Sequence, residues 1–192
     1  MVRVAVLVSG GGTNLQAILD SVGTVITFAE IALVISSSDK AYALTRAANA
    51  GVPSMVIKQE DELNAALSDN KIDLIVLAGY MKILSESFTA KWARRIINVH
   101  PSLIPSFCGK GMYGLRVHEA ALSYGVKVSG ATVHFVNEIP DGGEIIFQKA
   151  VEVLPDDTPE VLQRRIMEQA EWILLPRAIE HVAKEIKNAE LS

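Results

Sequence analysis

The sequence predicts an α/β fold: a doubly wound, mostly parallel sheet, Rossmann-like in its N-terminal half, extended by antiparallel strands and followed by a long C-terminal helix. Three observations predict it. Apolar, β-branched runs alternate with helix-like segments over the first hundred residues, and the connections between them are short. Two long strand-like segments then follow each other with no helix between them, which favours antiparallel pairing. A helix-like stretch ends the chain.

The parallel strands are expected where short apolar runs are bounded by turn residues. The run at residues 2–8 is continuous and β-branched, which is typical of a strand buried on both faces of a parallel sheet. The same reasoning predicts further strands at residues 31–35, 54–57, 72–78 and 96–99.

Helices are expected between these strands, over about residues 13–21, 40–50, 60–68 and 85–95. Thr13 and Asn14 are suitable caps for the first helix. Gly51 is positioned to close the second in a left-handed conformation, and Ser85 can cap the fourth. These start and stop signals support the alternation of strands and helices.

The pattern changes after His100. A loop rich in Gly and Pro is followed by the remaining expected elements: a helix over about 117–124, strands at 128–136 and 144–154 joined by NEIPDGG, and a helix from about Thr158. Pro159 suits the first turn of that helix. Pro176 is expected to kink or split it.

Composition excludes several classes of protein. The chain has 192 residues, of which 49% are hydrophobic, and a net charge of −4, so it should be ordered and carries no basic excess for binding nucleic acid. Its single cysteine, Cys108, excludes an intrachain disulfide and suits a reducing compartment. No signal peptide and no apolar stretch of about 20 residues is evident, so we expect a cytoplasmic protein without a membrane span.

Ligands of open α/β sheets bind at the carboxyl ends of the parallel strands. This rule puts three loops on one rim of the sheet: residues 9–14, residues 79–84 and the segment that starts at His100. In the first loop, three consecutive glycines precede a helix, whose free N–H groups attract anions. The loop is neither a Walker A nor a dinucleotide motif. A tight turn would explain it too, but phosphate binding is the favoured interpretation.

Asn98 and His100 are two positions apart in a strand and therefore share a face. An amide beside an imidazole suits stabilisation of an oxyanion, although a structural histidine at a strand end explains the pair equally well. Asp141 lies in a Pro-Asp-Gly turn signal, and it is functional only if the turn returns over the rim towards His100. A carboxylate there would orient the imidazole and favour its charged form.

The remaining histidines and the cysteine give weaker signals. His134 is as easily a packed residue as a catalytic one, while His118 and His181, on expected helices, are interpreted as surface or capping residues. Cys108 has no evident group to activate it. No cluster has the spacing of metal ligands, so no metal is expected.

Five stretches spread along the chain give it a family resemblance: VLVSGGGTNLQAILD, LAGYMKILS, INVHPSLIPSF, VSGATVHFV and DGGEII. In this order they resemble the phosphoribosylglycinamide formyltransferases, which transfer the formyl group of 10-formyltetrahydrofolate to glycinamide ribonucleotide. The resemblance implies one formyltransferase domain over residues 1–192, with a phosphate-binding half at 1–100 and a folate-binding and C-terminal half at 101–192. It implies only small-molecule substrates, and a monomer or homodimer.

Residue roles follow from the resemblance. It implies that Asn98, His100 and Asp141 are catalytic. It implies that the ribonucleotide is bound by Gly11, Gly12, Thr13, Asn14, Met81, Pro101 and Glu171. It implies that folate is bound by Tyr80, Met81, Lys82, Ile83, Leu84, Asn98 and Asp141.

The chain departs from the common family pattern at Gly11, Lys82 and Glu144 and in the length of the loop 106–116. The first two changes should be harmless, because the first loop acts through its backbone and Lys82 keeps the charge. The last two leave the geometry of the folate loop open.

Three rival functions share features with this sequence. A formyl-folate hydrolase would be expected to carry an extra N-terminal domain, and a methionyl-tRNA formyltransferase a basic C-terminal one. The sequence starts directly at the first strand and shows no basic excess. A phosphosugar-binding protein without chemistry would keep the glycine loop but would not need Asn98, His100 and Asp141 together.

Overall fold

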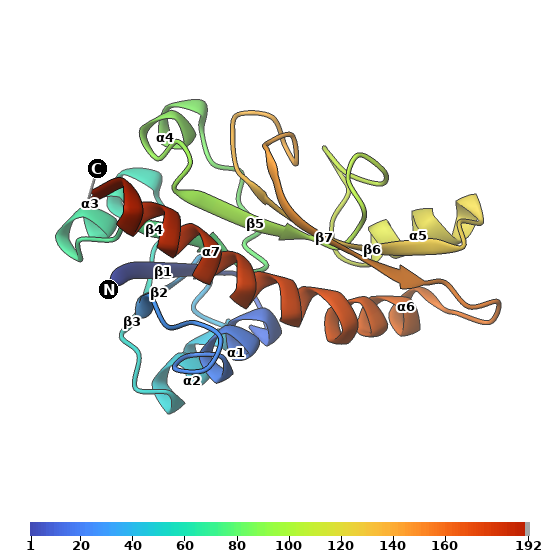
Figure 1. Ribbon diagram of the computed structural model, residues 1–192, viewed down its shortest axis with the longest axis horizontal. Coiled ribbons are helices and arrows are strands. Elements are labelled where there is room, and N and C mark those ends of the chain that lie inside the picture. Colours follow the sequence, from blue (N-terminus) through green and yellow to red (C-terminus); the bar gives the residue numbers. More distant parts are fainter. Residues whose placement is uncertain (191–192) are drawn as a thin grey trace.

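The structure is a computed structural model that describes residues 1–190, and in these residues one seven-stranded sheet carries helices on both faces (Figure 1). The strand order is β3-β2-β1-β4-β5-β6-β7. The strands are β1 (Val2–Val8), β2 (Ala29–Ser36), β3 (Ser54–Val56), β4 (Leu74–Leu77), β5 (Ile96–His100), β6 (Val128–Phe135) and β7 (Ile145–Glu152). The first five are parallel, while β6 and β7 pair antiparallel, which confirms the predicted fold class.

The helices cover the sheet in two layers, each with its own apolar core. They are α1 (Thr13–Asp20), α2 (Ala43–Asn49), α3 (Glu60–Asp69), α4 (Glu86–Lys91), α5 (Leu115–Tyr124), α6 (Pro159–Ile166) and α7 (Trp172–Glu190). Along β1, Val4 and Val6 pack against the layer that contains α1, α2 and α7, whereas Ala5 and Leu7 pack against α3 and α4. The strand therefore has both faces buried, as its continuous apolar run indicates.

The order of the strands positions the ligand site. The chain proceeds from β1 to β2 and β3 on one side and then returns to β4 and β5 on the other, so the direction of winding reverses between β1 and β4. In such sheets ligands bind outside the carboxyl ends of the strands at this switch point. The loops that follow β1, β4 and β5 meet there, as predicted.

The expected cap of the first helix and the expected end of the fourth are wrong, and local backbone geometry explains both. Helix α1 is preceded by Gly12 in a left-handed conformation, and neither Thr13 nor Asn14 caps it, because both already lie in the first turn. Helix α4 ends at Lys91 instead of about residue 95, because Arg94 adopts a positive φ of 57° that a right-handed helix excludes. The Ser85 cap is confirmed, since its hydroxyl accepts from the Phe88 N–H.

The C-terminal helix is interrupted, but not at Pro176 as expected. A π-helical segment, η1 (Met167–Glu171), separates α6 from α7, and α7 continues through Pro176. Proline lacks the N–H that a regular helix uses, and wide π turns are one way in which a helix accommodates an irregular hydrogen-bond pattern. The segment carries Glu171, which is buried.

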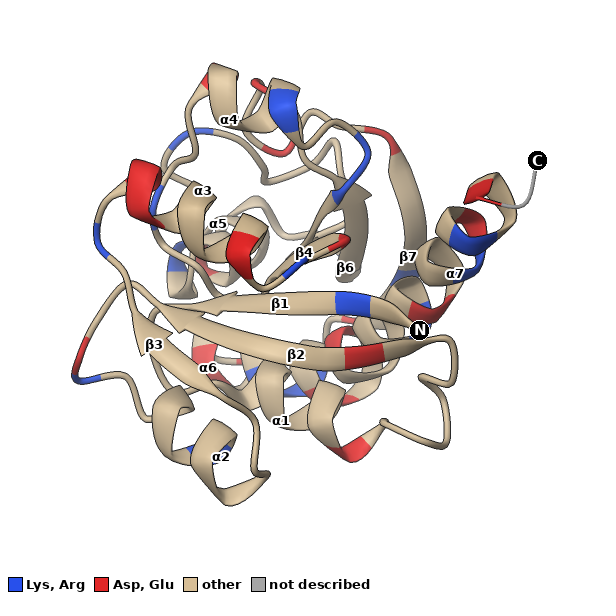
Figure 2. Cartoon of the chain, turned by 90° about the vertical axis from the view of Figure 1, so that its left-hand side faces the viewer, with Lys and Arg blue, Asp and Glu red and all other residues tan. Residues whose placement is uncertain are grey.

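Acidic and basic residues are interspersed along the elements of both layers (Figure 2). Within residues 1–190, no helix has the length and apolar character that crossing a membrane requires.

Candidate active site

The loop between β1 and α1 offers a row of free N–H groups. In the described part of the chain, the N–H groups of Gly11, Gly12, Thr13 and Asn14 donate to no protein acceptor, while Gln16 N–H begins the helical pattern by bonding the Gly12 carbonyl. Successive free N–H groups at a helix N-terminus form a concave site for an anion. The backbone here can thus bind a phosphate group.

Glycine is required at position 12 for two reasons. Its φ of 72° lies in the left-handed region, and a Cβ atom there would lie 2.7 Å from the Cβ of Ala43. Helix α2 therefore packs directly against the loop. Close packing and a left-handed turn explain a glycine that an ordinary turn would not need.

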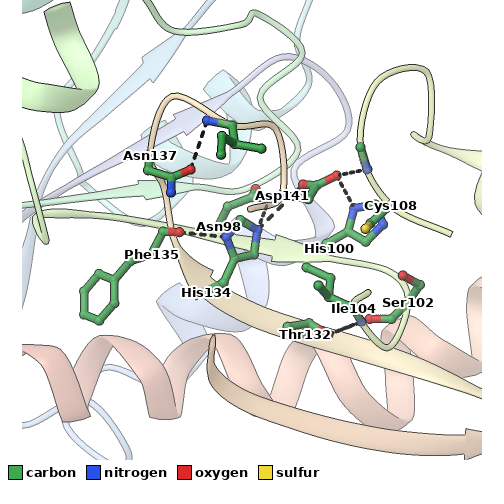
Figure 3. Close-up of polar contacts among 12 residues, drawn as sticks. Asn98, His100, Ser102, Ile104, Cys108, Thr132, His134, Phe135, Asn137 and Asp141 are labelled. Atoms are coloured by element: carbon green, nitrogen blue, oxygen red, sulfur yellow. Dashed lines mark hydrogen bonds and ion pairs between the residues drawn. The ribbon is translucent and has the colours of Figure 1, made fainter. Parts of the chain in front are cut away.

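Asp141 faces both imidazoles of the site (Figure 3). Its Oδ2 lies 3.5 Å from Nδ1 of His100, and its Oδ1 lies 3.7 Å from Nε2 of His134. Oδ2 also accepts a hydrogen bond of 2.8 Å from the N–H of Gly109, in the loop 106–116. The turn that carries Asp141 thus returns over the rim to His100, the geometry on which its predicted role depended.

Asn98 and His100 lie at the carboxyl end of β5, where His100 is buried and Asn98 half-buried. The Nε2 atom of His100 lies 2.9 Å from the Phe107 carbonyl. A carbonyl only accepts, so Nε2 carries the proton in the neutral ring, and Nδ1 is the atom that takes up a second proton beside Asp141.

His134 contributes to the site in a way that the sequence left undecided. Its Nδ1 donates to the Phe135 carbonyl over 2.8 Å, so in the neutral ring Nε2 has no proton and accepts from the Asn98 amide nitrogen at 3.2 Å. This contact orients the Asn98 amide and leaves its second N–H free. Only the antiparallel pairing that sets Asn98 opposite His134 reveals the relationship.

Burial and charge act in opposite directions on the two central groups. Burial lowers the pKa of His100, while the Phe107 carbonyl and the Asp141 carboxylate counteract part of that effect. Burial alone would raise the pKa of Asp141, but the facing His134, the Gly109 N–H and His100 together hold this pKa below its ordinary value. Asp141 is therefore a carboxylate at neutral pH and stabilises positive charge on His100.

Glu171 contacts Asn14 at the start of α1. Its Oε2 accepts a hydrogen bond of 2.7 Å from the amide of Asn14, and only 6% of the residue is exposed. Burial raises the pKa of Glu171 to about 7. A π-helical residue more than 150 positions away is thus brought beside the N-terminus of α1.

A hollow of about 150 Å³ lies between the loop 79–84, the end of β5 and the segment 136–141. Leu77 and Val136 give it apolar walls. The residues expected at folate that line it are Tyr80, Lys82, Ile83, Leu84, Asn98 and Asp141. Met81 does not line it: the residue is 56% exposed, and its N–H donates to the Ser9 hydroxyl, next to the glycine loop. Pro101 directly follows His100 at the end of β5.

The interpretation of His118 as a surface residue is wrong. It is fully buried on α5, neither ring nitrogen has a hydrogen-bond partner in the described residues, and burial together with nearby His100 lowers its pKa to about 4. Ala121 and Leu122, three and four positions further on, are a helical signal that this face is apolar. His181 is about half exposed and pairs with Glu185, as expected for the surface.

No group of three or more His, Cys, Asp or Glu among residues 1–190 could hold a metal ion. The residues of the site supply acid–base groups and hydrogen-bond donors, including the free N–H groups of the glycine loop.

The sequence and the fold match known proteins. Residues 2–179 match the family model described as formyl transferase. The chain is 42% identical over 188 residues to phosphoribosylglycinamide formyltransferase of Haemophilus influenzae, covering 93% of this chain and 86% of that protein. It is also 44% identical to the trifunctional purine biosynthetic protein adenosine-3 of Gallus gallus over 95% of its own length. The chain spans only 13–18% of the length of four adenosine-3 proteins that it matches.

Solved structures agree. Phosphoribosylglycinamide formyltransferase from Anaplasma phagocytophilum superposes with a TM-score of 0.88 at 39% identity, covering 96% of this chain and 87% of that one. Glycinamide ribonucleotide transformylase 1 from Symbiobacterium toebii gives a TM-score of 0.88 at 42% identity, covering 96% and 89%.

Proposed function

The chain belongs to the formyl transferase family, among the phosphoribosylglycinamide formyltransferases, and from this premise we propose that it transfers the formyl group of 10-formyltetrahydrofolate to the amine of glycinamide ribonucleotide in de novo purine biosynthesis. One observation carries the proposal. The Asp141 carboxylate faces His100 across 3.5 Å beside Asn98, on the same rim as a loop of free N–H groups.

The spacing of the two subsites suits such a substrate. Strand β4 alone separates β1, which precedes the glycine loop, from β5, which carries Asn98 and His100. Two strand spacings amount to about 10 Å. A ribose 5-phosphate with a short amine-bearing arm can bridge this distance, so the free N–H groups of the loop would bind the phosphate while the amine reaches β5. Glu171, beside Asn14, would bind the ribose hydroxyls.

Asn98 and His100 would stabilise the transition state. The attack of a neutral amine on the formyl carbon puts negative charge on the formyl oxygen. The free N–H of Asn98 and protonated His100 are the donors that would stabilise this charge. Because His134 already holds the Asn98 amide, little reorganisation would be needed during the reaction.

Asp141 would orient His100 and favour its protonated form against the opposing effect of burial. As the tetrahedral intermediate collapses, the bond between the formyl carbon and the folate nitrogen breaks, and the proton released by the attacking amine must reach that nitrogen. We assign this transfer to Asp141 and His100, through an ordered water molecule. No covalent bond to the enzyme forms in this scheme.

The hollow beside Asp141 supports folate as the formyl donor. Apolar walls with polar groups at the rim suit a flat heteroaromatic ring. Tyr80, Lys82, Ile83 and Leu84 would border the pterin, partly through backbone groups, and Met81 and Pro101 would contact the ribonucleotide.

The test is a formyl-transfer assay with purified protein and 10-formyltetrahydrofolate, run with and without glycinamide ribonucleotide. We expect deformylation of the folate only when the ribonucleotide is present. Formate release without it would indicate a hydrolase, and no turnover in either case would indicate a binding protein; both results contradict the proposal.

We further propose that residues 1–192 act as one formyltransferase domain, since a single sheet runs through both halves of the chain. We also propose that the protein is cytoplasmic. It would be a monomer or a homodimer, and its substrates would be small molecules only.

A further inference from the structure

Two residues of helix α2 donate hydrogen bonds to carbonyl groups of the glycine loop. The Ala43 N–H donates to the Gly10 carbonyl over 3.1 Å, and Nε of Arg46 donates to the Gly11 carbonyl over 2.8 Å. Figures 1 and 2 show α1 and α2 side by side at this end of the sheet. Two successive peptide groups are therefore oriented by one neighbouring helix.

Peptide geometry turns these two contacts into an effect on the anion site. In a planar trans peptide, the carbonyl of one residue and the N–H of the next point in opposite directions. With the carbonyls of Gly10 and Gly11 directed at α2, the N–H groups of Gly11 and Gly12 point away from it. These are the first two donors in the row of free N–H groups.

Further contacts fix the orientation of the Arg46 side chain. Its Nη1 donates to the Gln16 side chain on α1 over 3.0 Å, and its guanidinium lies 5.1 Å from the centre of the Tyr42 ring. A cation bonded to a carbonyl polarises the peptide and makes the attached N–H a stronger donor. The charge also lies next to a loop that would receive a dianion.

We propose that Arg46 is a positioning residue for phosphate recognition: it fixes and polarises the Gly11–Gly12 peptide so that its N–H binds the phosphate of the substrate. The inference rests on the proposed function in that the phosphate is taken to belong to the amine-bearing ribonucleotide. The inference assigns a part in phosphate recognition to a residue outside the loop. The planar guanidinium of Arg46 can donate to the Gly11 carbonyl and to Gln16 at the same time.

The test compares Arg46→Met and Arg46→Lys with the control Arg3→Met. Arg3 has the same pattern of contacts at the other end of β1: its Nε donates to the Asn70 carbonyl over 2.9 Å, and its Nη1 pairs with Glu30. Steady-state constants are measured with the ribonucleotide and with its dephosphorylated form, and ribose 5-phosphate binding is measured by calorimetry. Melting temperatures establish that each variant folds, and if Arg46→Met does not, Arg46→Lys carries the comparison.

We expect Arg46→Met to raise the KM for the ribonucleotide and the Kd for ribose 5-phosphate about tenfold, the loss of one charge-assisted hydrogen bond. The kcat, the KM for folate and turnover of the dephosphorylated substrate should change less than about twofold. Arg46→Lys keeps the charge but not the Nε donor, so its KM should stay raised, and Arg3→Met should resemble the wild type.

An unchanged KM in Arg46→Met would overturn the inference. So would full recovery in Arg46→Lys, which would reduce the effect to charge alone, or equal losses on both substrates, which would indicate a structural role. If the wild type transfers no formyl group but still binds ribose 5-phosphate about tenfold more tightly than Arg46→Met, the proposed function fails and the inference stands.

Discussion

Replacing Asp141 with asparagine removes the charge that faces His100 while keeping the shape of the side chain. The amide oxygen of Asn can still accept from Gly109 N–H, so the loop contact at 2.8 Å is preserved. The change therefore isolates the electrostatic part of the proposed role.

The size of the effect follows from the geometry. Two unit charges 3.5 Å apart attract by about 5 kcal/mol at an effective dielectric constant of about 20, which bounds what protonated His100 loses. Loss of a positioned acid–base group costs about 10²–10⁴ in rate, or about 2.7–5.5 kcal/mol. The electrostatic bound of about 5 kcal/mol lies within this range, so we expect kcat to fall by about 10²–10⁴.

The assay is formyl transfer over a range of pH, together with thermal unfolding. Without the carboxylate, the pKa of His100 falls further, so the residual rate should rise as the pH is lowered. The variant should melt near the wild-type temperature, and the control Asp156→Asn, at an exposed carboxylate, should be fully active. Turnover of Asp141→Asn within about twofold of the wild type, against the loss expected for an acid–base group, would refute the reasoning.

Three further predictions concern buried polar groups. Because burial raises the pKa of Glu171 from 4.5 to about 7, the free energy of unfolding should fall by up to about 3 kcal/mol as the pH rises through this window, and Glu171→Gln should abolish that slope in urea titrations. A slope that survives in the variant would assign it to another group. Burial alone would raise the pKa of Glu180, but the N–H groups of Phe28 and Thr27 and the Thr27 hydroxyl lower it to about 2. Glu180→Gln should therefore lose about 2–3 kcal/mol of stability at pH 7, a difference that disappears as the pH falls from about 4.5 to 2; equal loss at both ends would contradict the assignment. His134→Phe removes the acceptor that orients Asn98, and kcat should fall by about 10². In an Asn98→Ala background the same change should cost little more, and additive losses in this double-mutant cycle would show that His134 acts elsewhere.

Local patterns in the sequence are sufficient for most of the fold. Continuous β-branched runs mark strands buried on both faces, and short connections between strand and helix leave few arrangements other than a doubly wound sheet. The glycine loop and the Asn98–His100 pair are likewise local, because strand alternation alone puts the two side chains on one face. The resemblance to a family then supplied the residue roles.

Contacts between distant segments could not be derived in this way. Residue types do not reveal that Asp141 returns to His100, that His134 pairs opposite Asn98, or that Arg46 on α2 holds the Gly11 carbonyl. His118 was misplaced for the same reason, since burial of one helix face depends on what packs against it. Sequence determines which elements form, because hydrogen bonding and side-chain periodicity are local. Only the tertiary structure decides which polar atoms meet, because that depends on distances across the rim of the folded sheet.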